Sequence, residues 1–247
     1  MNIKKILDFI FIPNGRCPLC QRILFFTKEF ICDECLQKLK MTIGNKCRKC
    51  NKELSENEIN YCSDCLQYDY CFNEGYAQYK YEGAVKKLIY LLKFCHNPEL
   101  AVYLGESLGY NLLKMQWIKQ VDMIIPVPLH KNRKNIRGYN QSEKIAQGIC
   151  QVLNDTDNTK TIRIDTTSLL RKKDNLHQIE LNKIERFENV KNVFKVVNNE
   201  EINNKAILII DDVYTTGATI DSCCEALLKK GAKATYFAVL ASGKIQY

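Results

Sequence analysis

Thirteen of the 247 residues are cysteines, and eight of these form four pairs with the spacing Cys-x-x-Cys. Eleven residues separate each pair from the next, so the unit repeats every fifteen residues. A Cys-x-x-Cys turn directs two thiolates at one metal ion, and two such turns complete a tetrahedral four-sulfur zinc site. One pair alone would also suit a redox motif, whereas four pairs in register indicate two zinc ions. The predicted ligands are Cys17, Cys20, Cys32, Cys35, Cys47, Cys50, Cys62 and Cys65.

A four-thiolate site has no open coordination position, so the predicted role of the zinc is structural. Metal binding would supply folding energy that a core of about fifty residues lacks. We favour sequential pairing, first pair with second and third with fourth, over a crossed arrangement, which stays open. The other cysteines fit no ligand pattern and are expected to be core or surface thiols; they are Cys71, Cys95, Cys150, Cys223 and Cys224.

Two adjacent carboxylates, Asp211 and Asp212, follow an apolar segment that reads as a buried strand over residues 206–210. In open α/β sheets, ligands bind at the carboxyl edge of the strands. The next residues, Thr215–Gly217, form a turn whose amides and hydroxyls, with the helix start that follows, suit a phosphate. Because carboxylates repel a phosphate, we expect them to bind ribose hydroxyls or a divalent cation. The segment 207–219 therefore predicts a sugar-phosphate site.

Two further segments, 124–146 and 169–194, carry clustered cations and amides. Such cations suit a pyrophosphate or a nucleic-acid backbone, and a solvated basic loop is the alternative for any single lysine. The three histidines stand apart and are expected to be solvated. The candidate residues for pyrophosphate or nucleic acid are Lys131, Arg133, Lys134, Arg137, Asn140, Gln141, Arg171, Gln178 and Arg186.

The elements that must position these groups alternate along the chain. Apolar or alternating runs predict strands, and apolar residues three and four apart predict helices. Strands alternating with helices imply a parallel sheet with crossover connections. The expected strands are 75–81, 123–127, 206–210 and 235–240, and the expected helices are 85–94, 100–115, 141–153, 183–188 and 220–229.

Composition divides the chain into a Cys-rich module, residues 1–72, and an α/β domain, residues 73–247. The net charge of +8 permits contact with polyanions. Residues 1–72 hold 11 basic and 9 acidic groups. Eight thiolates with two zinc ions would make the net charge of this module negative. The basic surface would then belong to the second domain. The apolar run 6–12 is too short to span a bilayer, which predicts a cytoplasmic protein with reduced thiols. Peripheral contact of this run with the inner face of the membrane stays open.

The segment 207–219 resembles the signature of type I phosphoribosyltransferases: four apolar residues, two acids and a turn rich in Thr and Gly. The resemblance implies their fold, a ligand similar to 5-phosphoribosyl-1-pyrophosphate, and Mg²⁺. Carried over by position, Asp211 and Asp212 would bind the ribose and act in catalysis. The residues that would hold the 5′-phosphate are Val213, Tyr214, Thr215, Thr216, Gly217, Ala218 and Thr219.

The order of the Cys pairs, the Arg-Gly-Tyr-Asn-Gln block at 137–141, the block 178–194 and the acidic segment is similar to that of the ComF family of competence proteins. This resemblance implies a protein that assists uptake of single-stranded DNA in natural transformation. It implies two partners, a DNA translocase of the helicase type and a recombination mediator. Two functions compete: a DNA-binding protein that retains the ligand site, with Tyr139 stacking on bases, and an active Mg²⁺-dependent phosphoribosyltransferase acting on a nucleobase or related acceptor.

Overall fold

A parallel five-stranded sheet forms the centre of the computed structural model, which describes residues 15–24, 29–156, 160–173, 185, 189–190 and 192–243. The strand order is β1-β7-β6-β2-β3, and all paired neighbours run parallel. The strands are β1 (Glu74–Lys80), β2 (Met123–Pro126), β3 (Arg163–Ile164), β6 (Ala206–Tyr214) and β7 (Ala234–Ser242). The expected α/β class with a parallel central sheet is confirmed.

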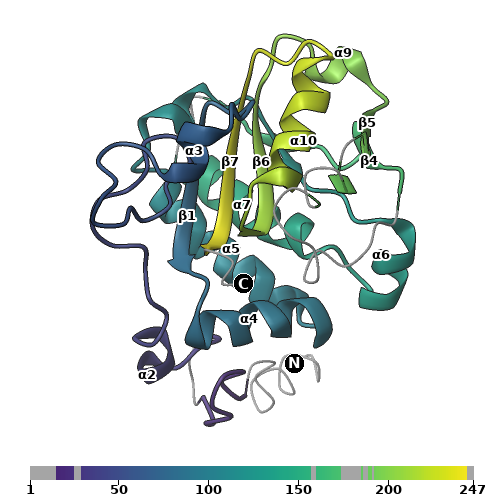
Figure 1. The fold of residues 1–247 in the computed structure, drawn as a ribbon. Helices are drawn as coiled ribbons and strands as arrows, with labels where there is room; N and C mark the ends of the chain where they lie inside the picture. The colour runs from purple at the N-terminus through teal and green to yellow at the C-terminus, as the bar shows by residue number, and fades with distance from the viewer. Residues whose placement is uncertain are drawn as a thin grey trace.

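Helices cover both faces of this sheet (Figure 1). One face packs against α4 (Gly83–Phe94), α5 (Pro98–Leu112) and α7 (Gln141–Thr156) in one apolar cluster. The other face packs against α10 (Ala218–Leu228) in a second cluster. In Figure 1, α4 lies beneath the tips of the strand arrows, so its end is close to the carboxyl edge of the sheet. The remaining elements are the 3₁₀ helix η1 (Gln116–Gln120), α9 (Asn199–Ile202) and the antiparallel pair β4 (Leu169–Arg171) and β5 (Phe194–Val196).

Two glycines allow α5 and α7 to cross closely. A Cβ atom on Gly105 would stand 2.2 Å from the carbonyl oxygen of Ile145, and one on Gly148 would stand 2.1 Å from that of Val102. Real Cβ atoms cannot approach so near, so any larger residue would push the helices apart. This packing fixes α7, whose first turn faces the two acids described below.

The structure differs from the expected elements in several places. Strand β6 continues to Tyr214, four residues past the predicted end, because β7 pairs with it as far as Ser242. The basic segment after β2, for which no helix was expected, forms a short helix, α6 (Lys131–Arg137), which ends at Gly138 in the left-handed conformation. The short strands β3, β4 and β5 were not predicted, and the helix expected at 183–188 lies outside the described residues apart from residue 185.

The Cys-rich segment wraps the β1 side of the sheet and contains two short helices, α2 (Asp33–Leu36) and α3 (Ser63–Gln67) (Figure 1). Its backbone adds hydrogen bonds along β1: the Thr42 amide donates to Gln78 O over 3.0 Å, and the Gly75 amide donates to Lys49 O over 2.8 Å. These bonds cover an edge strand that would otherwise expose unpaired groups. In the described part of the chain, no helix has the length and apolar character needed to cross a membrane.

Candidate functional site

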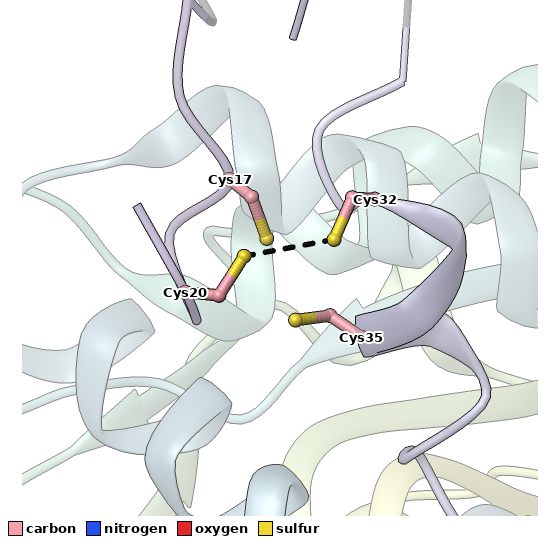
Figure 2. Close-up of side chains that lie close together, drawn as sticks. All are labelled: Cys17, Cys20, Cys32 and Cys35. Atoms are coloured by element: carbon pink, nitrogen blue, oxygen red, sulfur yellow. Dashed lines mark hydrogen bonds between the residues drawn. The ribbon is translucent and has the colours of Figure 1, made fainter. Parts of the chain in front are cut away.

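The eight paired cysteines gather into two four-thiol clusters. Within each cluster, the sulfur atoms all lie within 4.8 Å of one another, as the four ligands of one zinc ion must. Figure 2 shows the first cluster, in which the sulfurs of Cys20 and Cys32 are 3.6 Å apart. The first pair joins the second and the third joins the fourth, so the sequential pairing is confirmed and the clusters fit structural zinc. They are Cys17, Cys20, Cys32 and Cys35, and Cys47, Cys50, Cys62 and Cys65.

Both clusters are built on the same local backbone. In the first turn the Gln21 amide donates to Cys17 O, and in the third pair the Asn51 amide donates to Cys47 O. Gln21 and Asn51 each adopt positive φ angles, 65° and 60°. Burial raises the pKa of the Cys17 thiol, but hydrogen bonds from backbone groups outweigh it and lower that pKa to about 7. A lowered thiol pKa favours the thiolate that binds metal.

Asp211 and Asp212 belong to the last part of β6, beyond the point where β2 ends. Strand β2 ends at Pro126, opposite Ile210, which leaves this side of β6 open to the first turn of α7. The Asp211 carboxylate accepts from the Ser142 hydroxyl over 3.1 Å and from the Asp212 amide over 2.9 Å. Burial, and then repulsion by the Asp212 charge, raise the pKa of Asp211 to about 7.

Asp212 is 4% exposed and is neutralised by a lysine that the sequence did not single out. The ammonium of Lys93, near the end of α4, lies 3.0 Å from Asp212 Oδ2. The Gln141 side chain donates to the same oxygen over 3.3 Å. Two adjacent carboxylates in a shielded place need such partners, because an unpaired buried charge is costly. Lys93 therefore supplies the counter-charge that the acid pair needs in this shielded place.

Gln141 links the acid pair to the basic segment. Its side-chain oxygen accepts from Arg137 Nη1 over 3.1 Å, while its nitrogen donates to Asp212. The Arg137 guanidinium stands 5.5 Å from the centre of the Phe94 ring. Burial lowers the pKa of Arg137, and the charges of Asp212 and Asp211 oppose that effect. The structure thus brings together residues that the sequence separates by 71 positions.

The neighbours of Arg137 have local structural partners. Asn140 caps α7, since its side-chain oxygen accepts from the Ser142 amide over 3.0 Å, and its nitrogen donates to Val127 O over 3.0 Å. The Tyr139 hydroxyl donates to the backbone oxygen of Leu92. This contact ties α6 to α4. Lys134, on the exposed side of α6, pairs with Glu143 over 3.2 Å.

The turn after β6 has the geometry of a helix start. Gly217 precedes α10 with a φ of 82°, a left-handed conformation that suits glycine. The Thr216 side chain accepts from the Ala218 amide over 3.4 Å. A Cβ on Gly217 would stand 2.6 Å from the Tyr214 hydroxyl oxygen. Packing of the turn, as well as its backbone angle, therefore requires glycine.

The other candidate residues lie elsewhere or outside the described chain. Arg171 is on β4, where its guanidinium stands over Phe194 on β5, 5.7 Å from the ring centre. Lys131 is exposed and Arg133 half-buried on α6. Gln178 and Arg186 lie outside the described residues.

Sequence reasoning missed Lys93 and Ser142. Lys93 closes an amphipathic helix, where a lysine usually reads as solvated, so only the tertiary fold reveals its partner. Ser142 carried a usable signal: it directly follows the Arg-Gly-Tyr-Asn-Gln block, at the start of a helix that we expected to begin near a ligand.

Two family models match the sequence, one described as a double zinc ribbon domain over residues 6–66 and one as a phosphoribosyl transferase domain over residues 140–247. Competence protein ComFC of Bacillus subtilis is 28% identical over 87% of this chain and 85% of its own. DNA utilization protein YhgH of Escherichia coli O6:H1 is 28% identical over 88% and 92%. Competence protein F of Haemophilus influenzae is 28% identical over 89% and 93%.

Among solved structures, a purine phosphoribosyltransferase from Pyrococcus horikoshii covers 58% of this chain and 71% of its own, at 20% identity and a TM-score of 0.34. The relatives named above span nearly the whole chain, and both halves match the expected kinds of domain in the expected order. The comparisons thus confirm the resemblance of this chain to the ComF family: a double zinc ribbon domain precedes a phosphoribosyl transferase domain.

Proposed function

We propose that this protein binds a ribose-phosphate ligand at the end of β6 and acts in the handling of single-stranded DNA during natural transformation. The supporting observation is that the Gln141 side chain links the acid pair to the basic segment through hydrogen bonds to Asp212 and Arg137. Acceptors for sugar hydroxyls and donors for phosphates thus stand side by side. The names of the relatives, competence protein and DNA utilization protein, support the biological setting.

The chemistry of the donor set fits a ligand similar to 5-phosphoribosyl-1-pyrophosphate. Asp211 and Asp212 offer acceptors to the ribose hydroxyls, and the turn 215–219 offers backbone N–H groups at the start of α10 to the 5′-phosphate. Hydroxyls are neutral donors, so they can satisfy both carboxylates without the repulsion that a phosphate would meet. Mg²⁺ would accompany the ligand and would reduce the negative charge of its pyrophosphate.

Lys93 must move away for a ribose to reach Asp212, because the Asp212 side chain is 6% exposed and is paired with the ammonium. Lysine has a long flexible side chain, and the side chain of Lys93 is 25% exposed, so its ammonium can move toward solvent or toward a ligand phosphate. On this proposal, the Lys93 ammonium occupies the Asp212 carboxylate until the sugar hydroxyls replace it.

The proposed DNA surface is the basic helix α6, with Arg171 as a further contact. Lysines and arginines on one short helix can follow a phosphate backbone without reading its sequence. Tyr139 is half-buried with its hydroxyl engaged, so only part of its ring is available for stacking. The proposed partners are a helicase-type DNA translocase and a recombination mediator, at the cytoplasmic side of the inner membrane.

An active Mg²⁺-dependent phosphoribosyltransferase is the second candidate, favoured by the presence of both adjacent acids and the full turn 215–219. In such an enzyme, catalysis would come from positioning and charge neutralisation. An acceptor, a nucleobase or a related nucleophile, would then be consumed and pyrophosphate released. Release of pyrophosphate in the presence of a panel of bases separates this candidate from simple binding.

Calorimetric titration with 5-phosphoribosyl-1-pyrophosphate and Mg²⁺ tests the ligand proposal. We expect the wild type to bind the ligand. Asp212→Ala should lower the affinity about tenfold or more, because it would remove two hydrogen bonds from ribose hydroxyls to a charged carboxylate. Glu225→Ala, which removes an exposed carboxylate on α10, is the control and should bind normally. Absence of wild-type binding would refute the proposal, and base-dependent turnover that Asp212→Ala abolishes would favour the enzyme.

Fluorescence anisotropy with labelled single-stranded DNA at several salt concentrations tests the DNA proposal. We expect affinity to fall steeply with salt, and Lys131→Ala or Arg137→Ala to reduce the salt slope by about one each. Lys229→Ala, on an exposed side of α10, is the matched control. Equal losses for all three variants would show that only overall charge matters and would remove α6 as the binding surface.

A further inference from the structure

Tyr70 joins the second zinc cluster to the turn that precedes α10. Its side chain is 3% exposed, and its hydroxyl donates to the backbone oxygen of Thr216 over 2.7 Å. The two residues are 146 positions apart, and Tyr70 follows the last zinc ligand, Cys65, by five residues. A second bond lies beside it: the Cys71 amide donates to the Asp221 carboxylate, in the first turn of α10, over 2.6 Å. The zinc ribbon thus holds the back of the turn at two points.

The hydroxyl bond determines the orientation of one peptide unit. In a trans peptide, the C=O of one residue and the N–H of the next point in opposite directions, and the described chain has no cis peptide. Since the Thr216 carbonyl points at Tyr70, the N–H of Gly217 points away from the ribbon. Glycine tolerates more than one backbone conformation, so without this bond the Thr216–Gly217 peptide could rotate and withdraw that N–H.

Among the described residues, the packing around Tyr70 involves the second zinc cluster and not the first. Tyr70, Phe72 and Tyr214 lie in the same apolar cluster as the thiols of the second zinc site. The Lys52 ammonium, 2.7 Å from the Asp64 carboxylate, stands 5.3 Å from the centre of the Tyr214 ring. The thiols Cys17, Cys32 and Cys35 of the first site belong to the cluster on the opposite face of the sheet, with α4 and α5.

We propose that Tyr70 is a positioning residue for the proposed phosphate-binding turn, and that the second zinc cluster, unlike the first, forms part of the framework of that site. The ligand part of this inference rests on the proposed binding of a ribose phosphate. Tyr70 touches no ligand: it directs the Gly217 amide outward, and the zinc-bound ribbon keeps Tyr70 in place.

Tyr70→Phe tests the inference because it removes the hydroxyl and keeps the ring. Tyr103→Phe is the matched control. The Tyr103 hydroxyl donates to Glu29, which lies three positions before Cys32 of the first zinc cluster. With full-length, zinc-loaded protein, calorimetry should give about tenfold weaker binding of ribose 5-phosphate for Tyr70→Phe. Tyr103→Phe should bind as the wild type does, and both variants should retain the wild-type zinc content.

Hydrogen exchange without ligand separates this inference from the ligand proposal. We expect the amides of residues 216–219 to exchange faster in Tyr70→Phe than in the wild type, and at the wild-type rate in Tyr103→Phe. If the wild type binds no ribose phosphate, the ligand proposal fails while the exchange rates still decide whether Tyr70 positions the turn. Unchanged exchange together with unchanged binding in Tyr70→Phe would overturn the inference.

A pair of cysteine variants tests the part played by the second cluster. Cys62→Ser should accelerate exchange at residues 216–219, whereas Cys35→Ser should accelerate exchange near the first cluster and leave the turn unchanged. Equal exchange at the turn in both variants would refute the distinction between the two clusters. If Cys62→Ser fails to fold, Tyr70→Phe still carries the test.

Discussion

Replacing Lys93 with methionine should destabilise the protein by about 3 kcal/mol. The Lys93 ammonium lies 3.0 Å from Asp212 Oδ2, and the Asp212 side chain is 6% exposed. At this separation, Coulomb's law with an effective dielectric constant of about 20 gives an attraction of about 5 kcal/mol, which desolvation of both charges offsets in part. Removing one partner of a buried ion pair typically costs about 3–5 kcal/mol. Because the Lys93 side chain is 25% exposed, we take the lower end of this range.

A double-mutant cycle with Asp212→Asn isolates the interaction. Asp212→Asn should cost only about 1 kcal/mol, because the lysine can turn toward solvent and the repulsion from Asp211 disappears. The two changes together should cost much less than their sum, giving a coupling energy of about 2 kcal/mol. Unfolding in urea at pH 8, monitored by circular dichroism, measures all four proteins. The control cycle is Lys229→Met with Glu225→Gln, an exposed pair 2.5 Å apart on α10, with an expected coupling of about 0.5 kcal/mol or less.

A coupling energy for Lys93 and Asp212 no larger than that of the exposed control pair would refute this prediction. So would a smaller cost for Lys93→Met than for Asp212→Asn, because Lys93→Met leaves two carboxylates without a counter-charge. A change in the urea m-value would mark a change in the unfolded or folded ensemble and not in the pair alone.

Two further predictions concern metal and pH. Mass spectrometry of the native protein should give two zinc ions per chain, and Cys32→Ser should leave one. Strong chelators should lower the thermal midpoint of unfolding, because the metal contributes folding energy to the ribbons. A fully folded, metal-free protein would contradict this prediction. Asp211, with its pKa raised to about 7 from 3.8, retains in the folded state a proton that the unfolded chain has lost. Its contribution to stability is therefore complete below about pH 4 and lost as the pH rises to about 7. Asp211→Asn should flatten the urea-derived stability between pH 5 and 8, and an unchanged slope would count against the raised pKa.

The zinc clusters and the sheet could be predicted because their signals are local. A thiolate pair spaced for one metal ion is complete within four residues, and its repetition indicates how many ions to expect. The strands at residues 206–214 and 234–242 are nearly continuous apolar runs, as both-face burial in a parallel sheet requires. The acids were expected just past a strand that ended at 210; they lie within it, since the length of a strand depends on its neighbour as well as on its own residues.

The contacts that support the site could not be predicted in the same way. Lys93 and Tyr70 have ordinary surroundings in the sequence, and each acquires its role from a partner more than a hundred positions away. The helix α6 was not expected, because Lys131–Arg137 lacks the apolar periodicity by which a helix is recognised. Gln141 was expected to bind pyrophosphate or nucleic acid, whereas in the structure its side chain bonds to Asp212 and Arg137.

The negative charge of the two carboxylates restricts which ligands could bind at the proposed site. Two carboxylates stand beside a turn suited to a phosphate, and in the free protein Lys93, with the hydroxyl of Ser142 and the amide of Gln141, offsets their charge. A free phosphate brings negative charge and no hydroxyl donors, so it would meet the acids at a disadvantage. A ribose phosphate would bring both a phosphate and hydroxyl donors. Its hydroxyls would replace the Lys93 ammonium at Asp212, and the ammonium could then face the phosphate. At pH 8 we therefore expect the protein to bind ribose 5-phosphate much more tightly than inorganic phosphate. Lys93→Met should reduce the difference between these two affinities. Equal affinities in the wild type would mean that the acids take no part in binding.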